Sequence, residues 1–598
     1  MRAAFVSLVM NGETPAEIRH LFFGARLTAI SKEGGGVCPI AVGCTLRHSV
    51  AKITSGSVIG EISAFLAPRQ LGYGVKGGAE SAVHASRWYL KSLHPSQDNL
   101  KLDFQNAFNS ICRDRMLHSN YPLPSTLLFI HATQPHLPFS GREGFLNVGL
   151  SLNSRKSEVI CENREVHDHL LPSLPNSLYI DPSNATLLGS PLGDVACVSA
   201  ALRAKVASLS VMGERLRSFS AHDSILLLRY SFAIPKLLYL LQTAPCFLSS
   251  TIREYDSSLC SIVSGISNAS LSVSDHIWLQ ASLPVRSGGL GFRCVVQLAP
   301  SAFLASAAVS FPVFCAILGA FKAPLIPFQE VALEKWSTTL VDVFPPSGDN
   351  AKLQRAWDFP HVAATFTSLC DGAPDPASRD CLMAVSSPHS GLWLNALPLS
   401  SLGLRMDDCT IRIAVGLHLG LPLCHPHSCS HCGGHVNMFA THGLSCRRSE
   451  GVPFRLEPSG LNRCDGKRPD GVTMVPWSSG KSLVWDATCP DTLDPSYERV
   501  AVCSRGAVAQ ASEKCAKYKS LDCSYSFTPV AIETLGAIGP KSLSFLKKLG
   551  SRIREQTGEV SSFSYLLQRL SVAVQRANAI SVMGTLPKLS YPDTFFLS

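Results

Sequence analysis

The feature that most constrains this chain is a set of four potential metal ligands near its C-terminus. They follow the spacing Cys-x2-Cys-x9-His-x3-Cys and comprise Cys429, Cys432, His442 and Cys446. A Cys-x2-Cys turn holds two thiolates at the angle that one Zn²⁺ requires, and zinc prefers four tetrahedral sulfur and nitrogen ligands. Since this set leaves no coordination position open, the sequence predicts a structural zinc site.

Nearby side chains leave the ligand set open. Four other residues of the right types lie close in sequence: Cys424, His427, His431 and His435. A chance cluster is the alternative, because the chain has 21 cysteines. Those cysteines are odd in number and scattered over 598 residues, unlike the disulfide framework of a small secreted domain. With no recognisable export signal at the N-terminus, we expect a reducing compartment inside the cell.

Length and composition indicate a folded protein of several domains. A chain of 598 residues exceeds the size of a single hydrophobic core, so roughly three to five domains are expected. Hydrophobic residues make up 46% and charged residues 16%, which excludes a disordered chain. The formal charge of +9 permits a polyanionic partner, although a solvated basic surface explains it equally well.

One apolar stretch raises the question of a membrane span. No charged residue lies between Arg293 and Lys322, a length that would suit a transmembrane helix. Pro300 and Pro312 interrupt the stretch, and proline breaks helices by removing a hydrogen bond. We therefore expect two short buried helices and no membrane partner.

Two aspartates downstream of the zinc candidate suit a divalent-cation site. Asp470 precedes an alternating segment at 471–477, and a turn at 478–480 leads into a strand that ends on Asp486. A hairpin would bring both carboxylates to one cation, and Mg²⁺ accepts few carboxylates with several waters. Glu457 could add a third acid. The alternative is an ordinary Pro-Asp-Gly turn.

A predicted helix at 499–521 supplies the basic groups. Its periodicity places four residues on one apolar face: Val508, Ala511, Cys515 and Tyr518. Lys514 and Lys517 lie three residues apart, so both are expected to point into the same pocket. A lysine beside a metal orients the attacking water or stabilises charge on phosphorus. The alternative for Lys517 is a surface pair with Glu513.

Together these motifs resemble the proteins of non-LTR retrotransposons. Residues 101–108 follow a Lys-x-Asp-(aromatic)-x-x-Ala-Phe pattern, similar to the first catalytic motif of reverse transcriptases. In the C-terminal part, the Cys-x2-Cys, His-Gly-Leu-x-Cys-Arg, Arg-Pro-Asp-Gly, Val-Trp-Asp and Lys-x-x-Lys-Tyr motifs occur in the order of the restriction-like endonuclease of these elements. The resemblance covers most of the chain.

The resemblance implies an α+β multidomain fold that contains a partial right-hand polymerase, a small zinc motif and a PD-(D/E)xK-like α/β endonuclease domain. The implied domains are a fingers and palm remnant at 1–194, a helical thumb-like region at 195–330, a helical and loop connector at 331–423, a zinc-binding motif at 424–450, and an endonuclease domain with C-terminal helices at 451–598.

It also implies roles for individual residues. Asp470 and Asp486 correspond to the metal-binding acids of the nuclease, and its lysine is displaced to Lys514 or Lys517. Asp103 corresponds to a Mg²⁺ ligand of the polymerase. The chain departs from the family in two places. Neither a Gln-Gly loop nor a Tyr-x-Asp-Asp motif occurs between Asp103 and Gly149, so the palm is internally deleted and polymerase activity is expected to be lost. Only five residues separate Arg448 from Phe454, where the family has a longer helix.

By this resemblance the protein would nick target DNA so that the new 3′ end primes copying of element RNA. Its cofactors would be structural Zn²⁺ and Mg²⁺, and its partners the DNA target and element RNA. Its location would be the nucleus or a cytoplasmic ribonucleoprotein. The alternative is a decayed copy without catalysis that acts at most as a nucleic-acid-binding protein. The oligomeric state has no signature in the sequence.

Overall fold

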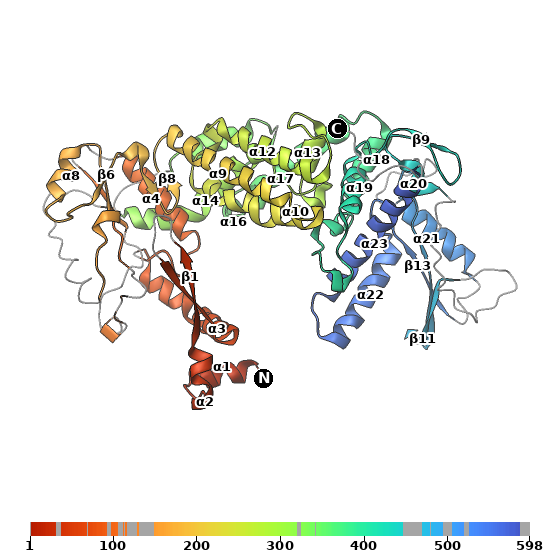
Figure 1. Cartoon of the computed structure of the whole chain (residues 1–598), viewed down its shortest axis with the longest axis horizontal. Helices are drawn as coiled ribbons and strands as arrows, with labels where there is room; N and C mark the ends of the chain where they lie inside the picture. The colour runs from red at the N-terminus through yellow and green to blue at the C-terminus, as the bar shows by residue number, and fades with distance from the viewer. Residues whose placement is uncertain are drawn as a thin grey trace. The chain divides into compact units, whose positions relative to one another are not determined.

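The computed structural model describes residues 2–31, 37–68, 70–92, 97–105, 110, 112, 114–115, 128–130, 149–319, 325–340, 342–446, 469–478, 480–493, 505–519 and 525–586. The fold is α+β, rich in helices, with strands in small sheets of two to four members. Contacts divide the chain into two compact units (Figure 1). The first contains Met1–Leu188 and Val309–Pro327, and the second contains Gly189–Ala308 and Phe328–Ser598.

The first unit begins with helices and a β-hairpin and continues into a four-stranded sheet. The N-terminal elements are α1 (Arg2–Met10), α2 (Ala16–Phe23), β1 (Ala25–Ser31), β2 (Val37–Gly43), α3 (Thr45–Leu66) and α4 (Gly78–Lys91). The sheet has the order β4 (Leu128–Ile130), β3 (Asn99–Lys101), β5 (Glu158–Ile160) and β6 (Leu178–Ile180). β3 is antiparallel to both neighbours, while β5 and β6 are parallel. Helix α8 (Arg164–Leu170) follows β5, and its residue Leu170 packs against the buried Leu174.

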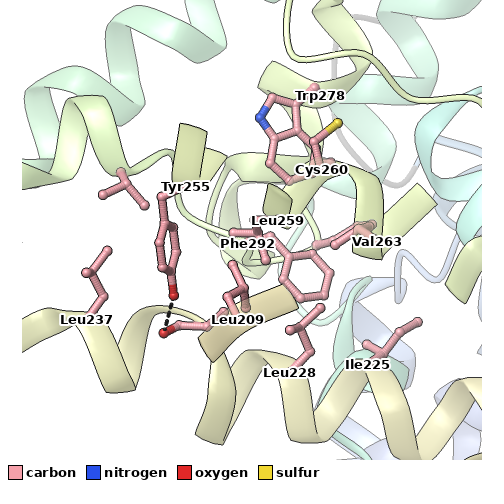
Figure 2. Close-up of a cluster of buried hydrophobic side chains, with 14 of the residues drawn as sticks. Leu209, Ile225, Leu228, Leu237, Tyr255, Leu259, Cys260, Val263, Trp278 and Phe292 are labelled. Carbon is pink, nitrogen blue, oxygen red and sulfur yellow. Dashed lines mark hydrogen bonds between the residues drawn. The ribbon is translucent and has the colours of Figure 1, made fainter. Parts of the chain in front are cut away.

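The second unit is built on a helical core. Its first helices are α9 (Val195–Leu216), α10 (Ala221–Leu227), α11 (Ile234–Thr243), α12 (Thr251–Ser267), α13 (His276–Ser282) and the start of α14 (Val295–Leu318). Leucines on several faces meet aromatic side chains in this core, among them Trp278 and Phe292 (Figure 2). Tyr255 is fully enclosed there, and its hydroxyl donates to the Ala233 carbonyl oxygen at 3.0 Å. The helical character expected for 195–330 is present in the described residues.

The segment expected to be a connector contributes to the same core. It contains α15 (Gln329–Ser337), α16 (Gly348–Ala351), α17 (Gln354–Asp371), α18 (Pro376–Val385) and α19 (Asp408–Leu419). Trp393, Leu404 and Ile411 are buried against the residues of α9 to α14. Since these side chains close one core, residues 331–423 are a packed part of the second unit.

Helix α14 corrects one expectation from the sequence. It runs unbroken from Val295 to Leu318, so the prediction of two short helices divided at the prolines was wrong. At its N-terminus the buried Asp256 carboxylate accepts hydrogen bonds from the Val295 and Val296 backbone N–H groups, at 2.8 and 3.2 Å. Burial raises the pKa of Asp256, and these two hydrogen bonds oppose the rise. A proline inside a helix costs about 3 kcal/mol, and extensive apolar burial along α14 offsets that cost.

Within the residues that the structure describes, three helical segments are long and apolar enough to cross a membrane, judged by length and composition alone: Val195–Leu216, Ala221–Thr243 and Val295–Leu318. The share of the most apolar window buried inside the protein is 17%, 44% and 56%, respectively. The most apolar of the three, Val295–Leu318, is therefore also the one most covered by other parts of the chain.

The C-terminal part of the second unit places a small sheet beside helices. The strands β11 (Gly471–Ser478), β12 (Lys481–Thr488) and β13 (Ser526–Ala531) lie in that order. β11 and β12 form the antiparallel hairpin that the sequence predicted, and Gly480 takes the left-handed conformation in its turn, with φ +73°. β13 is parallel to β12. The remaining helices are α21 (Arg505–Lys517), which contacts β13, and the neighbouring pair α22 (Pro540–Thr557) and α23 (Ser562–Gly584) (Figure 1).

Candidate metal centre and acid pair

The four predicted metal ligands come together around two short strands and one helical turn. Strands β9 (His427–Ser428) and β10 (His435–Val436) pair, and α20 (Thr441–Ser445) follows them. All four ligand atoms lie within 4.8 Å of one another.

The distances inside the cluster agree with one tetrahedral ion. Cys429 Sγ is 3.9 Å from Cys446 Sγ, and Cys432 Sγ is 3.1 Å from His442 Nε2. Two sulfurs bound to one tetrahedral zinc, each at about 2.3 Å, lie about 3.8 Å apart. The cluster is therefore able to hold a metal ion such as zinc.

The turn between the two cysteines shapes this cluster through backbone hydrogen bonds. The Cys429 N–H donates to the Gly434 carbonyl oxygen at 2.8 Å, and the Gly433 N–H donates to the Cys429 carbonyl oxygen at 2.9 Å. Gly433 has φ +74°, a conformation that glycine adopts without strain. The Gly434 N–H also donates to Cys432 Sγ at 3.3 Å. The local sequence therefore preforms the ligand geometry.

The two cysteines of the turn have opposite pKa shifts. Burial acts to raise the pKa of Cys429, but hydrogen bonds from the Cys432 and His431 backbone and from the His442 and Cys432 side chains outweigh it and lower the pKa to about 6. For Cys432, the Gly434 hydrogen bond acts to lower the pKa. Desolvation together with Cys429 and Cys446 raises it overall. Because a thiolate is the metal-binding form, Cys429 is prepared for coordination.

The alternative ligands from the sequence lie elsewhere. Cys424 Sγ donates to the Asn437 carbonyl oxygen at 3.5 Å, and His427 Nε2 lies 3.2 Å from the Thr585 carbonyl oxygen. His435 is exposed. In the described part of the chain, the cluster of Cys429, Cys432, His442 and Cys446 is the only group of three or more side chains arranged to hold a metal.

The segment that carries the four candidate ligands, residues 427–446, packs against the C-terminal end of α23. The Ser430 N–H donates to the Thr585 carbonyl oxygen at 3.0 Å, and the Ser430 hydroxyl donates to the Gly584 carbonyl oxygen at 2.6 Å. A side chain at Gly443 would lie 3.0 Å from the Val582 Cα atom, so α20 approaches α23 closely. A metal here would stabilise the contact between this segment and the C-terminal helices.

The hairpin brings the two predicted acids together. The register pairs Gly471 with Trp485, which places Asp470 opposite the end of β12. Asp470 Oδ2 accepts a hydrogen bond from the Ala487 N–H at 2.5 Å. The Asp486 side chain is 5% exposed, and its Oδ2 lies 2.8 Å from Lys514 Nζ. Two carboxylates and one ammonium group therefore converge at the open end of the β11–β12 hairpin.

The charges in this acid pair oppose one another. Desolvation is the largest cause that raises the pKa of Asp470, and the neighbouring Asp486 raises it further. The Ala487 N–H and the positive charge of Lys514 act in the opposite direction. The like charge of Asp486 therefore disfavours ionisation of Asp470, and a cation bound beside the two carboxylates would remove that effect.

Of the two predicted lysines, both on helix α21, only one contacts the acid pair. Lys514 reaches Asp486, whereas Lys517 is exposed and its Nζ lies 4.9 Å from the centre of the Tyr518 ring. Three residues turn a helix by about 300°, which leaves the two side chains about 60° apart. That difference is enough for Lys514 alone to reach Asp486. The buried face contains Ala511 and Tyr518, as expected. Val508 is 42% exposed, so its predicted place on that face was wrong.

Two parts of the predicted nuclease lie outside the described residues. Glu457, the proposed third acid, is one, and the short link from Arg448 to Phe454 is the other. Where the structure is described, no third metal-binding side chain joins Asp470 and Asp486.

Asp103 lies just after β3 in the four-stranded sheet. Its Oδ2 accepts a hydrogen bond from Asn153 Nδ2 at 2.9 Å, and its backbone oxygen accepts one from the Asn153 N–H at 2.8 Å. Its own N–H donates to the Ser157 hydroxyl at 3.2 Å. The structure thus brings the Asp103 segment beside the residues that lead into β5, and its catalytic role stays a prediction.

One residue that supports the acid pair was not predicted. Glu533 is buried at 2% exposure, and its Oε1 accepts a hydrogen bond from the Ala507 N–H at 3.0 Å. A carboxylate at a helix N-terminus is stabilised by the unpaired N–H groups there. Glu533 thereby fixes the start of α21, the helix that carries Lys514. The sequence feature that could have indicated this residue is an acid directly after the apolar run at 530–532.

No model of a known protein family matches this chain, and no curated protein matches it. Function is therefore inferred from the chemistry of the side chains and from their arrangement.

Proposed function

We propose that this chain is a retrotransposon-derived, Mg²⁺-dependent endonuclease that nicks DNA and has lost polymerase activity. The observation that carries the proposal is the convergence of Asp470, Asp486 and Lys514 at the open end of the β11–β12 hairpin. Two carboxylates and a lysine are the groups that metal-assisted phosphodiester hydrolysis requires.

Each residue has a defined task in this reaction. Asp470 and Asp486 would bind Mg²⁺ through carboxylate oxygens, a choice that suits a hard cation. The bound Mg²⁺ would polarise the phosphoryl oxygen and lower the pKa of a bound water. Lys514 would leave Asp486 for the phosphate, orient the attacking water and stabilise the negative charge that develops on phosphorus.

The order of elements supports the same assignment. Both acids lie on the β11–β12 hairpin, and the lysine lies on α21, which precedes the parallel strand β13. This arrangement suits the PD-(D/E)xK-like domain that the motif order implies. Lys514 is the lysine we assign to catalysis, because Lys517 lies over Tyr518.

The remaining features receive supporting roles. We assign the Cys/His cluster to structural Zn²⁺, since it has four ligands and no open position. Asp103 is a remnant of the polymerase, whose other catalytic motifs the sequence lacks. Target DNA and element RNA are the partners we propose, in the nucleus or in a cytoplasmic ribonucleoprotein.

The nuclease is tested by nicking of supercoiled plasmid DNA with purified protein. We expect Mg²⁺-dependent conversion to open circles by the wild type, and a loss of at least about 100-fold in Asp486→Asn and in Lys514→Gln. Lys517→Gln is the matched control, because it removes the same charge from the same helix and should nick at the wild-type rate. Wild-type activity no higher than that of Asp486→Asn would refute the proposal.

A non-catalytic nucleic-acid-binding protein is the second candidate. The observation that favours it is the direct 2.8 Å ion pair between Lys514 and Asp486, because a purely structural ion pair would have the same geometry. The same assay separates the candidates, because this protein would retain DNA in a gel-shift experiment without nicking it.

A further inference from the structure

Helix α22 carries an excess of positive charge. Its 18 residues include five lysines and arginines and one glutamate. The opposite face is buried through Ser542, Leu546 and Gly550. The charges are therefore confined to the part of the helix that faces water.

Three of these residues form a row along the helix, which we name the α22 cation line: Lys541, Lys548 and Arg552. All three are exposed. They are seven and four positions apart, which returns each to nearly the same angle on a helix of 3.6 residues per turn. With a rise of 1.5 Å per residue, the row extends over about 16 Å.

The two ends of the line are held by neighbouring elements. Lys541 Nζ lies 3.3 Å from Cys515 Sγ, and Cys515 directly follows Lys514 on α21. At the other end, the Arg552 guanidinium stacks 3.7 Å from the centre of the Trp477 ring and donates to the Trp477 carbonyl oxygen. The line thus begins beside the helix of the candidate catalytic lysine and ends on strand β11.

Within the described part of the chain, two members of the line have no carboxylate partner. For the described residues, no ion pair within 4.0 Å joins a carboxylate to Lys548 or Arg552. Like charges four residues apart destabilise a helix. A polyanion laid along the row would remove that repulsion.

We propose that the sugar–phosphate backbone of the DNA substrate lies along the α22 cation line. The identity of the polyanion as DNA rests on the proposed function, while the line itself follows from the positions of the charges. Lys548 would act as a point charge on a phosphate, and the stacked Arg552 would offer its remaining N–H donors in a fixed plane. Such contacts position the duplex without reading its sequence.

The test measures the binding of a 20-base-pair duplex at several salt concentrations in buffer without Mg²⁺, which leaves the zinc cluster intact. Each phosphate contact contributes about 0.9 to the slope of log K against log salt concentration. We expect Lys548→Gln to reduce the slope by about 0.9, and Lys548→Gln/Arg552→Gln by about 1.8. Lys547→Gln/Arg554→Gln is the matched control, because it removes two exposed charges from the same helix away from the line.

Several outcomes would overturn the proposal. They are an unchanged slope in the Lys548 variant, an equal loss in the control pair, or tighter binding of RNA of the same sequence. Among the described residues Lys548 has no hydrogen bond or ion pair within the protein, so Lys548→Gln keeps the test valid if Arg552→Gln unfolds. Cleavage needs Mg²⁺, so its omission separates binding from nicking. A failure of nicking with a normal slope would reject the nuclease, while DNA binding along the α22 cation line would stand.

Discussion

Replacement of Lys514 by methionine isolates the ion pair at the centre of the acid site. The Asp486 side chain is 5% exposed and Lys514 is 21% exposed, so water screens their 2.8 Å contact poorly. Removal of one partner from a buried pair costs about 3–5 kcal/mol, because the other charge is left without compensation. Here the negative charge of Asp470 adds to that cost. We expect Lys514→Met to lower the free energy of unfolding by about 3 kcal/mol at pH 7.

The assay is urea denaturation of the full chain, followed by circular dichroism and repeated with a double variant. Asp486→Asn/Lys514→Met removes both charges and should recover most of the loss, since replacing a whole buried pair is close to neutral. Lys517→Met is the control and should change stability by less than about 0.5 kcal/mol. If Lys514→Met and Lys517→Met have equal midpoints, Asp486 is not held by Lys514 and the reasoning fails.

Two further predictions concern pH and metal. Since the pKa of Asp470 is raised in the folded protein, its ionisation costs stability as pH rises through the interval from 3.8 to that raised value. Asp470→Asn should therefore be more stable than the wild type at pH 7 but not at pH 3, measured by thermal unfolding; a wild-type advantage at pH 7 would contradict this. Metal analysis should find one zinc per chain, lost in Cys429→Ser/Cys432→Ser, and a chelator should lower the melting temperature of the wild type alone. If that double variant retained zinc, the cluster would not be the zinc site.

Local features of the metal cluster and of the acid pair could be predicted from the sequence. The Cys-x2-Cys turn, the hairpin and the helix that follows it depend on contacts between residues close together in the chain. Turn residues such as Gly433 and Gly480 and the alternation of apolar side chains carry that information. The prediction of four clustered metal ligands succeeded for the same reason, since 18 consecutive residues contain all of them.

The tertiary structure decided which of these side chains meet. Sequence spacing left Lys514 and Lys517 equivalent, and the packing of α21 against β13, with Glu533 at its start, turned only Lys514 toward Asp486.

The course of α14 and the place of residues 331–423 were decided in the same way. Burial among distant helices keeps α14 continuous through its prolines and draws the expected connector into the core. Local patterns cannot encode these outcomes, because the free energy that selects them comes from surfaces brought together only when the whole unit folds.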